Sequence, residues 1–169
     1  MCRTGCRCNR KRLDMASLSR TSFVPLLKKY LAIVDPAKVL EWGPGDSTEV
    51  ILENSRAMVF SREHDQRWFD KSKARFEGYD RWSIVLESIT RVNSYYAYRA
   101  VFDAPYDLIF IDGRRRVECC MIGLDMISPG GVLILHDAQR PHYSVIRKYI
   151  NIIDQEQNGQ TIVFKGREC

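Results

Sequence analysis

Short apolar segments that alternate with amphipathic ones are the feature that most constrains the fold of this 169-residue chain. Nearly continuous apolar runs such as 107–111 and 131–135 are typical of strands that are buried on both faces of a sheet. Strands are expected at Lys38–Trp42, Ala57–Ser61, Ser83–Glu87, Leu108–Asp112, Val132–His136 and Gln160–Lys165. Helices are expected over 23–34 and at Ser47–Asn54, Gln66–Glu77, Arg115–Ile127 and Tyr143–Ile153. This rhythm predicts an α/β fold, a three-layer sandwich whose mostly parallel sheet has about six strands and helices on both faces.

The positive charge of the chain is concentrated at its beginning. Residues 1–30 hold eight Lys or Arg and one acid, whereas the other 139 residues hold 18 bases and 20 acids. We therefore divide the chain into a basic tail over 1–20 and one domain over 21–169. Such tails are often solvated, and some anchor nucleic acid or anionic membrane. We expect the tail to be solvated and expect no nucleic-acid partner.

Several classes of protein are disfavoured by composition. No apolar run approaches the roughly 20 residues that a membrane helix requires, so no membrane partner is expected. The N-terminus lacks the apolar stretch of a secretory signal, which predicts a cytoplasmic protein. The cysteines at 2, 6, 8, 119, 120 and 169 form no Cys-x-x-Cys pair, and we expect them to be free thiols.

The first predicted strand runs into a glycine-containing turn, Glu41-Trp42-Gly43-Pro44-Gly45-Asp46-Ser47-Thr48. Glycines let the backbone turn tightly and approach a ligand, and Ser47 or Thr48 can cap the helix that follows. The N-terminus of that helix offers free N–H groups to the ligand. There is no Gly-Lys-Ser/Thr, which excludes an ATPase phosphate loop. An acid at 41 instead suits a ligand with a cationic end.

The second predicted strand leads to another acid, Glu63, which follows Gly45 by 18 residues. A carboxylate at this place is suited to accept hydrogen bonds from the two hydroxyls of a ribose. NAD enzymes use the same device. Glu63 therefore indicates a nucleoside cofactor without choosing which one.

The pattern Glu41-x-Gly43-x-Gly45-x-Ser47-Thr48, followed by Glu63, resembles the cofactor half of class I S-adenosylmethionine-dependent methyltransferases. The resemblance spans about 38–143 and implies a Rossmann-like fold that binds S-adenosyl-L-methionine. It implies that Glu41 lies near the methionine end, that Glu63 binds the ribose and that His64 flanks the adenine. The remaining cofactor-binding residues that it implies are Gly43, Gly45, Ser47, Thr48, Glu87 and Ser88, the last two near the adenine amino group.

Three candidate catalytic residues end the fourth and fifth strands: Asp112, His136 and Asp137. The carboxyl ends of parallel strands meet at one crevice, where these groups can act as general bases or hold a divalent metal. Ala138 stands where a third acid would complete a metal site, so we expect no metal. We hypothesise that His136 is the base, with Asp137 orienting it or contacting substrate.

The arginines around these strand ends suggest the acceptor. Asp-Gly-Arg-x-Arg-Val, followed by His-Asp-x-x-Arg-Pro-x-Tyr, is similar to a group of bacterial class I methyltransferase-like proteins. The expected substrate-binding residues are Arg114, Arg116, Arg140 and Tyr143. Arginine forks bind carboxylate or phosphate, which favours O-methylation of a small anionic or sugar-like acceptor. The alternative is that these arginines pair with Asp112 or Asp137 and hold the loops. Arg115 stands where sugar O-methyltransferases carry a histidine, and we expect it to be dispensable.

Two rival functions stay open at this point. One is an NAD-type nucleotide-binding oxidoreductase, although Thr48 stands where its third glycine would be. The other is a non-catalytic Rossmann-like binding module with a basic nucleic-acid-binding tail.

The C-terminal part of the chain is short for the fold. Only 26 residues follow Tyr143, which predicts one helix and one strand. Either the sheet is abbreviated at this edge, or a second subunit completes it in a homodimer. Upstream of the fourth strand, Tyr95, Tyr96 and Tyr98 form an acceptor lid or pack against the sheet.

Overall fold

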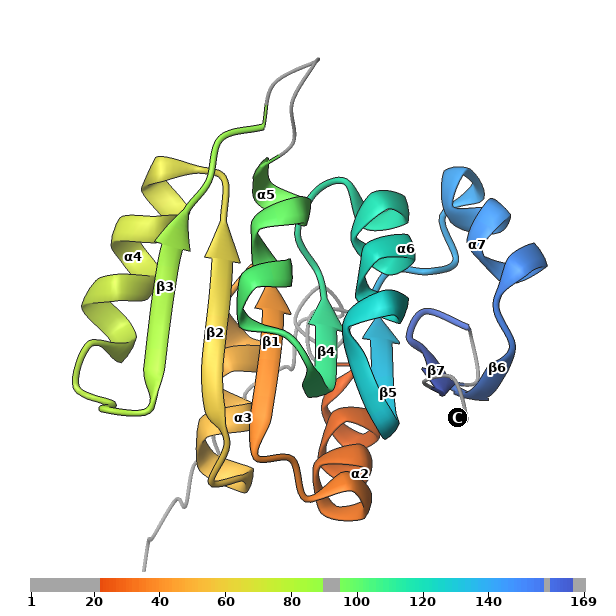
Figure 1. The fold of residues 1–169 in the computed structure, drawn as a ribbon, viewed down its shortest axis with the longest axis horizontal. Helices are drawn as coiled ribbons and strands as arrows, with labels where there is room; N and C mark the ends of the chain where they lie inside the picture. The colour runs from red at the N-terminus through yellow and green to blue at the C-terminus, as the bar shows by residue number, and fades with distance from the viewer. Residues whose placement is uncertain (1–21, 90–94, 157–158, 166–169) are drawn as a thin grey trace, which may run out of the picture.

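The computed structural model describes residues 22–89, 95–156 and 159–165. The elements follow one another along the chain as α2 (Val24–Val34), β1 (Lys38–Trp42), α3 (Asp46–Asn54), β2 (Met58–Glu63), α4 (Gln66–Phe76), β3 (Trp82–Leu86), α5 (Tyr95–Tyr98), η1 (Arg99–Asp103), β4 (Tyr106–Ile111), α6 (Arg116–Met126), β5 (Ile127–Leu135), η2 (Pro141–Tyr143), α7 (Ser144–Tyr149), β6 (Ile152–Gln155) and β7 (Ile162–Lys165) (Figure 1). The basic tail and Cys2, Cys6 and Cys8 lie outside the described residues. No helix of the described ranges is long and apolar enough to cross a membrane.

One seven-stranded sheet organises the molecule, in the order β3-β2-β1-β4-β5-β7-β6. The first five strands in this order are parallel, and β7 is antiparallel to both of its neighbours. The prediction of an α/β fold with a mostly parallel sheet is therefore confirmed. All six predicted strands are present within a few residues of the expected bounds.

The seventh strand corrects two expectations about the C-terminal edge. Residues 143–153 were expected to form one helix, but α7 ends at Tyr149 and β6 begins at Ile152. Residues of β6 alternate between half-buried and exposed, which is the period of a strand rather than of a helix. The sheet is thus not abbreviated, and no second subunit is needed to complete it. A homodimer stays an untested expectation.

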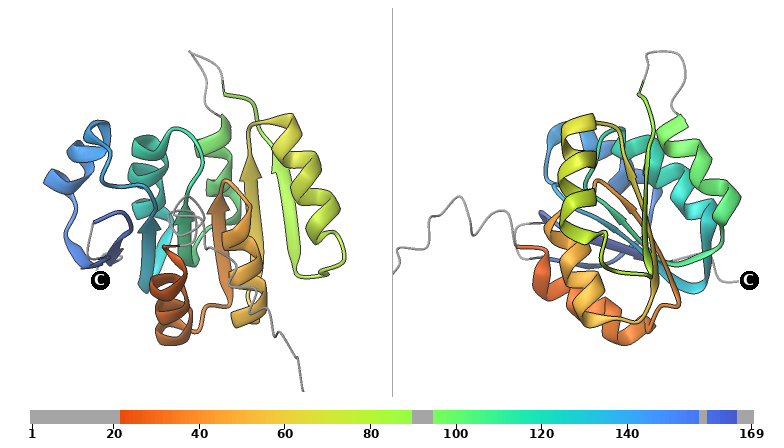
Figure 2. Two further views of the ribbon diagram at one scale, coloured as in Figure 1. Left: turned by 180° about the vertical axis from the view of Figure 1, so that it is seen from behind. Right: turned by 90° about the vertical axis from the view of Figure 1, so that its left-hand side faces the viewer.

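Helices cover both faces of the sheet, as the edge-on view of Figure 2 shows. On one face, residues of α2, α3 and α4 form a buried cluster with Val39, Phe110 and Ile134. On the other face, α5, α6 and α7 pack over Leu40, Trp42 and neighbouring strand residues. Adjacent residues of β1 belong to opposite clusters because side chains alternate across a strand. This double burial explains the continuous apolar runs in the sequence.

The segment before β4 places its tyrosines in different surroundings. Tyr96 on α5 is fully buried, and its carbonyl oxygen accepts a hydrogen bond from the indole of Trp42 at 2.8 Å. Tyr98 is exposed, and the Tyr95 side chain lies outside the described part of the chain. Tyr96 therefore packs against the sheet rather than forming a lid.

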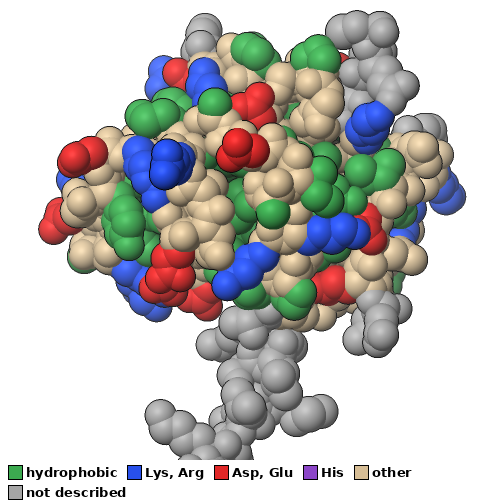
Figure 3. Space-filling view, turned by 90° about the horizontal axis from the view of Figure 1, so that it is seen from below, with side chains coloured by type: hydrophobic (Ala, Val, Ile, Leu, Met, Phe, Trp, Pro, Cys, Tyr) green, Lys and Arg blue, Asp and Glu red, His purple; other side chains and the backbone are tan. Residues whose placement is uncertain are grey.

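The face at the amino ends of the parallel strands is shown in Figure 3. Lys and Arg side chains of the described residues are interspersed there with Asp and Glu, and they do not form one basic surface. Charge mixed in this way offers little to a polyanion.

Candidate functional site

A cleft of about 870 Å³ lies at the carboxyl ends of the central strands. Twelve of the residues expected in the site line this cleft: Gly43, Gly45, Ser47, Glu63, His64, Asp112, Arg114, Arg116, His136, Asp137, Arg140 and Tyr143. The cleft lining does not include Glu41, Thr48, Glu87 or Ser88. In a parallel α/β sheet, the crevice beyond the carboxyl ends of the strands is where ligands bind.

The turn between β1 and α3 forms the floor of the cleft. Gly43 has a φ of +87°, a conformation that favours glycine. A Cβ atom on Gly43 would lie 2.6 Å from the backbone nitrogen of Gly113, which follows β4. A Cβ on Gly45 would meet no atom of the described residues within 4 Å. Gly43 thus allows two strand ends to approach closely, whereas Gly45 leaves open space in the cleft.

Glu41 lies beneath this turn and is fully buried. Its carboxylate accepts hydrogen bonds from the hydroxyls of Ser47 at 2.5 Å, Thr48 at 2.7 Å and Ser61 at 2.9 Å. Burial raises its pKa to about 7, against the opposing effect of these hydroxyls. Its oxygens help to fix the turn, and the expectation that Glu41 lies near the methionine end of the cofactor stays a prediction. Thr48 also helps to fix the turn, because its hydroxyl accepts the N–H of Gly45 at 2.9 Å.

Glu63 ends β2 at the wall of the cleft. Its Oε1 accepts the backbone N–H groups of His64 at 2.6 Å and Asp65 at 2.9 Å. The Nδ1 atom of His64 lies 2.8 Å from the same oxygen. These contacts fix the carboxylate through one oxygen, and Oε2 takes part in none of them. A fixed carboxylate on the cleft wall is suited to accept hydrogen bonds from a diol.

Glu87 and Ser88, expected near an adenine, lie apart from the cleft lining. Glu87 is buried, and its Oε1 lies 3.5 Å from the guanidinium groups of both Arg62 and Arg99. Arg62 also donates to Asp103 at 2.9 Å. The carboxylate of Glu87 therefore joins β2 and β3 to η1, which is a structural task that its place in the sequence did not reveal.

Arg116 joins the two strand ends that carry the candidate catalytic residues. This buried side chain donates to the carbonyl oxygens of Gly113, His136 and Asp112, and to the carboxylate of Asp112 at 2.8 Å. Its Nη1 also lies 3.3 Å from Asp137. With its donors engaged in this way, Arg116 cannot form a fork with a substrate. The contacts of Arg116 therefore fit the alternative given in the sequence analysis, in which an arginine pairs with Asp112 or Asp137 and holds the loops.

Burial favours the uncharged form of both Asp112 and His136, so it raises the pKa of the acid and lowers the pKa of the base. Burial, with a smaller contribution from Asp137, raises the pKa of Asp112 to about 6, while Arg116 opposes it. Burial lowers the pKa of His136 to about 4. The Nδ1 of His136 lies 3.0 Å from the hydroxyl of Thr161, which the sequence did not indicate as a neighbour. His136 is thus a neutral ring at neutral pH and a weak base.

Within the described part of the chain, the same three residues form the one group that could hold a metal ion. Asp112, His136 and Asp137 each provide one ligand atom, and these atoms lie within 4.8 Å of one another. However, Arg116 pairs with both carboxylates, and Arg140 pairs with Asp137. A divalent cation would have to displace these guanidinium groups, so the surroundings fit a metal poorly.

The remaining expected substrate contacts differ from one another. Arg114 is exposed on the cleft, and its side chain takes part in no ion pair among those found in the described residues. Arg140 is paired with Asp137. The guanidinium carbon of Arg116 lies over the ring of Tyr143, 5.6 Å from the centre of that ring. Of the three arginines expected to bind an anionic acceptor, Arg116 and Arg140 are paired with carboxylates of the protein, and Arg114 is the one whose side chain is in none of the ion pairs found in the described residues.

Several cleft residues escaped the sequence analysis. On α4, Trp68, Lys71 and Arg75 line the cleft, and so do Phe23, Gln139 and Gln160 from other parts of the chain. The spacing of Trp68, Lys71 and Arg75 shows that they share one face of a helix, and this could be read from the sequence. The sequence did not indicate that this face turns toward α3, because its orientation depends on the ion pairs of Arg75 with Asp46 and Glu49.

Comparison with solved structures places this fold among known enzymes. A methyltransferase-like protein from Silicibacter pomeroyi superposes with a TM-score of 0.68 at 22% identity, over 86% of each chain. The N-methyltransferase NodS from Bradyrhizobium japonicum, solved with S-adenosylhomocysteine, gives 0.63 at 16% identity, over 94% of this chain and 92% of that one. The O-methyltransferase TomG from Streptomyces achromogenes, solved with S-adenosylmethionine, gives 0.62 at 13% identity, over 90% and 88%. The fold is that of methyltransferases. No protein-family model and no curated protein sequence matches the chain.

Proposed function

We propose that this protein transfers the methyl group of S-adenosylmethionine to a hydroxyl group of a small molecule. The observation that carries the proposal is that the Gly43–Ser47 turn and the Glu63 carboxylate line one cleft. These two features are suited to the amino-acid part and the ribose of one nucleoside cofactor. The similar fold of methyltransferases solved with this cofactor or its product supports the choice over NAD.

Different residues of the cleft would bind different parts of the cofactor. The backbone of Gly43 and Gly45 and the N-terminus of α3 would hold the methionine part, Glu63 the ribose hydroxyls, and His64 the edge of the adenine. S-adenosylmethionine supplies an electrophilic methyl group, which moves to the acceptor oxygen as the sulfur leaves with the bonding electrons. The protein mainly aligns the two partners, which can lower the barrier by ~7–11 kcal/mol.

Asp112 is a better candidate than His136 for the base that takes the hydroxyl proton. A base works best when its pKa lies near the working pH. The pKa of Asp112 is raised to about 6, whereas that of His136 is lowered to about 4. Asp112 also lines the cleft, while its Arg116 contact holds the carboxylate in place. We therefore assign the base to Asp112 and the orientation of the β5 end to His136.

Calorimetric titration with S-adenosylhomocysteine tests the cofactor assignment. We expect saturable binding to the full chain and a loss of about tenfold to a hundredfold in affinity in Glu63→Gln, which removes the charge that accepts the ribose hydrogen bonds. Glu53→Gln, at an exposed position of α3, is the matched control and should bind as the parent does. Saturable binding of NAD in the absence of S-adenosylhomocysteine binding would overturn the proposal.

The pH dependence of turnover tests the base. Because Asp112 accepts a proton only when ionised, turnover should rise as the pH increases through about 6 and level off above it. We expect Asp112→Asn to lower turnover by about 10²–10⁴-fold at pH 7.5, measured as release of S-adenosylhomocysteine with a panel of hydroxyl acceptors. His136→Gln should retain the inflection. If His136→Gln removes the inflection and Asp112→Asn leaves it, the two assignments must be exchanged.

A further inference from the structure

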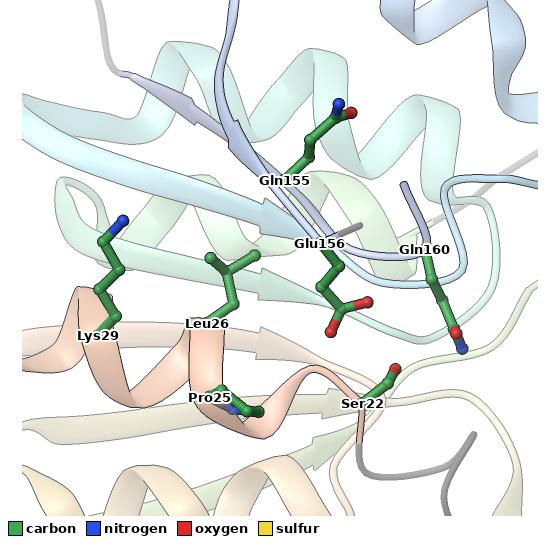
Figure 4. A pocket seen from close by; sticks show the side chains of 7 residues that line it. All are labelled: Ser22, Pro25, Leu26, Lys29, Gln155, Glu156 and Gln160. Carbon is green, nitrogen blue, oxygen red and sulfur yellow. The ribbon is translucent and has the colours of Figure 1, made fainter. Parts of the chain in front are cut away.

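A second cavity, of about 600 Å³, lies beside the cleft between the start of α2 and the β6–β7 hairpin (Figure 4). Pro25 and Leu26 give it an apolar wall, while Ser22, Glu156 and Gln160 give it polar groups. Gln160 also lines the main cleft, where Phe23, the residue after Ser22, lies as well. The side pocket, as we name this cavity, therefore adjoins the cleft and shares Gln160 with it.

Glu156 is a charged group of the side pocket with which no cation of the described residues forms an ion pair. Its Oε2 accepts the N–H of Thr161 at 3.1 Å, which fixes the carboxylate. Its Oε1 is buried and has no hydrogen-bond partner among the described residues, and the same is true of the Ser22 hydroxyl beside it (Figure 4). Burial raises the pKa of Glu156, and hydrogen bonding by Thr161 opposes this; the nearby Ser22 hydroxyl also opposes it, although its geometry falls short of a hydrogen bond. A buried carboxylate oxygen without a partner is costly unless a ligand supplies a donor.

The lysine that borders the side pocket does not neutralise Glu156. The Nζ atom of Lys29 donates to Asp154 at 2.6 Å, and the Tyr30 hydroxyl donates to the same carboxylate oxygen at 3.2 Å. In Figure 4 the Lys29 side chain extends away from Glu156. Among the described residues that line the pocket, the charged group that remains available to a ligand is thus the negative carboxylate of Glu156.

We propose that the side pocket binds an ammonium group on the methyl acceptor, with Glu156 as its counter-ion and with the Ser22 hydroxyl accepting a further N–H hydrogen bond. The apolar wall of Pro25 and Leu26 contacts the alkyl part next to the ammonium. The proposal rests on the proposed function, because the acceptor's hydroxyl lies in the adjoining cleft. It assigns the acceptor to the class of amino alcohols, rather than to the anionic acceptors that the arginine pattern suggested.

Backbone amide signals in NMR spectra of the full chain test the pocket, with n-butylammonium as the probe. We expect butylammonium to shift the Glu156 and Thr161 signals saturably, and 1-butanol and butyrate not to do so. In Glu156→Gln, which can still accept the Thr161 N–H, the affinity for butylammonium should fall by about tenfold or more. Glu53→Gln, on the exposed side of α3, should leave it unchanged.

Three results would overturn the proposal. Equal binding of 1-butanol would show an apolar pocket, and unchanged affinity in Glu156→Gln would show that the carboxylate is not the counter-ion. A gain in affinity in Arg20→Ala would show that the preceding basic segment is the occupant. S-adenosylhomocysteine titration of the same samples separates the two levels: if that ligand binds while butylammonium does not, the proposed function stands and the side-pocket assignment falls.

Discussion

Gly43→Ala is expected to lower the free energy of unfolding by at least about 3 kcal/mol. The added Cβ would lie 2.6 Å from the nitrogen and 2.7 Å from the Cα of Gly113. The φ of +87° adds strain for any residue other than glycine. Neither backbone can move away easily, because β1 and β4 are paired neighbours in the middle of the sheet. Urea unfolding followed by circular dichroism measures the effect.

Gly45→Ala is the matched control two residues further along the same turn. Its Cβ would lie more than 4 Å from every atom that the described ranges place around it, so the free energy of unfolding should stay close to that of the parent. The new methyl group would occupy the cleft, however, and should weaken S-adenosylhomocysteine binding. If Gly43→Ala is as stable as Gly45→Ala, the close approach of the two strand ends is not a constraint on the fold.

Arg116→Ala is expected to destabilise the protein by about 3–5 kcal/mol. The substitution leaves the carboxylates of Asp112 and Asp137 without their shared cation and removes three hydrogen bonds to carbonyl oxygens. It also breaks the link between the ends of β4 and β5, so we expect S-adenosylhomocysteine affinity to fall with stability. Chemical unfolding and calorimetry measure the two effects.

Arg114→Ala provides the comparison, since it removes the same side chain two residues earlier. Arg114 is exposed on the cleft, and an exposed side chain outside an ion pair contributes within about 0.5 kcal/mol. Equal losses of stability in the two variants would contradict the view that Arg116 is structural and Arg114 is available to a ligand.

The strands of the parallel sheet were predictable because each is encoded locally. A strand segment buried on both faces, such as Leu108–Ile111 of β4, must be apolar, and this leaves a pattern that one segment carries by itself. The glycine turn was predictable for the same reason, since the positive φ of Gly43 restricts the residue type at that position. β6 was missed because four residues with weak alternation carry too little local signal against an apolar run that also fits a helix.

The sequence by itself determined the five parallel strands and the helices between most of them, the turn at Gly43 and the cluster of polar residues at the strand ends. Only the tertiary structure decided which of those polar residues line the cleft and which are held by protein partners. Glu41 and Glu87 are engaged with protein partners and are not part of the cleft lining, whereas Glu63 and Arg114 line the cleft. Asp112 and Arg116 line the cleft and are also paired with each other. The physical reason is that backbone preference and burial period are properties of short segments. Ion pairing and desolvation depend instead on groups that folding brings together from distant parts of the chain.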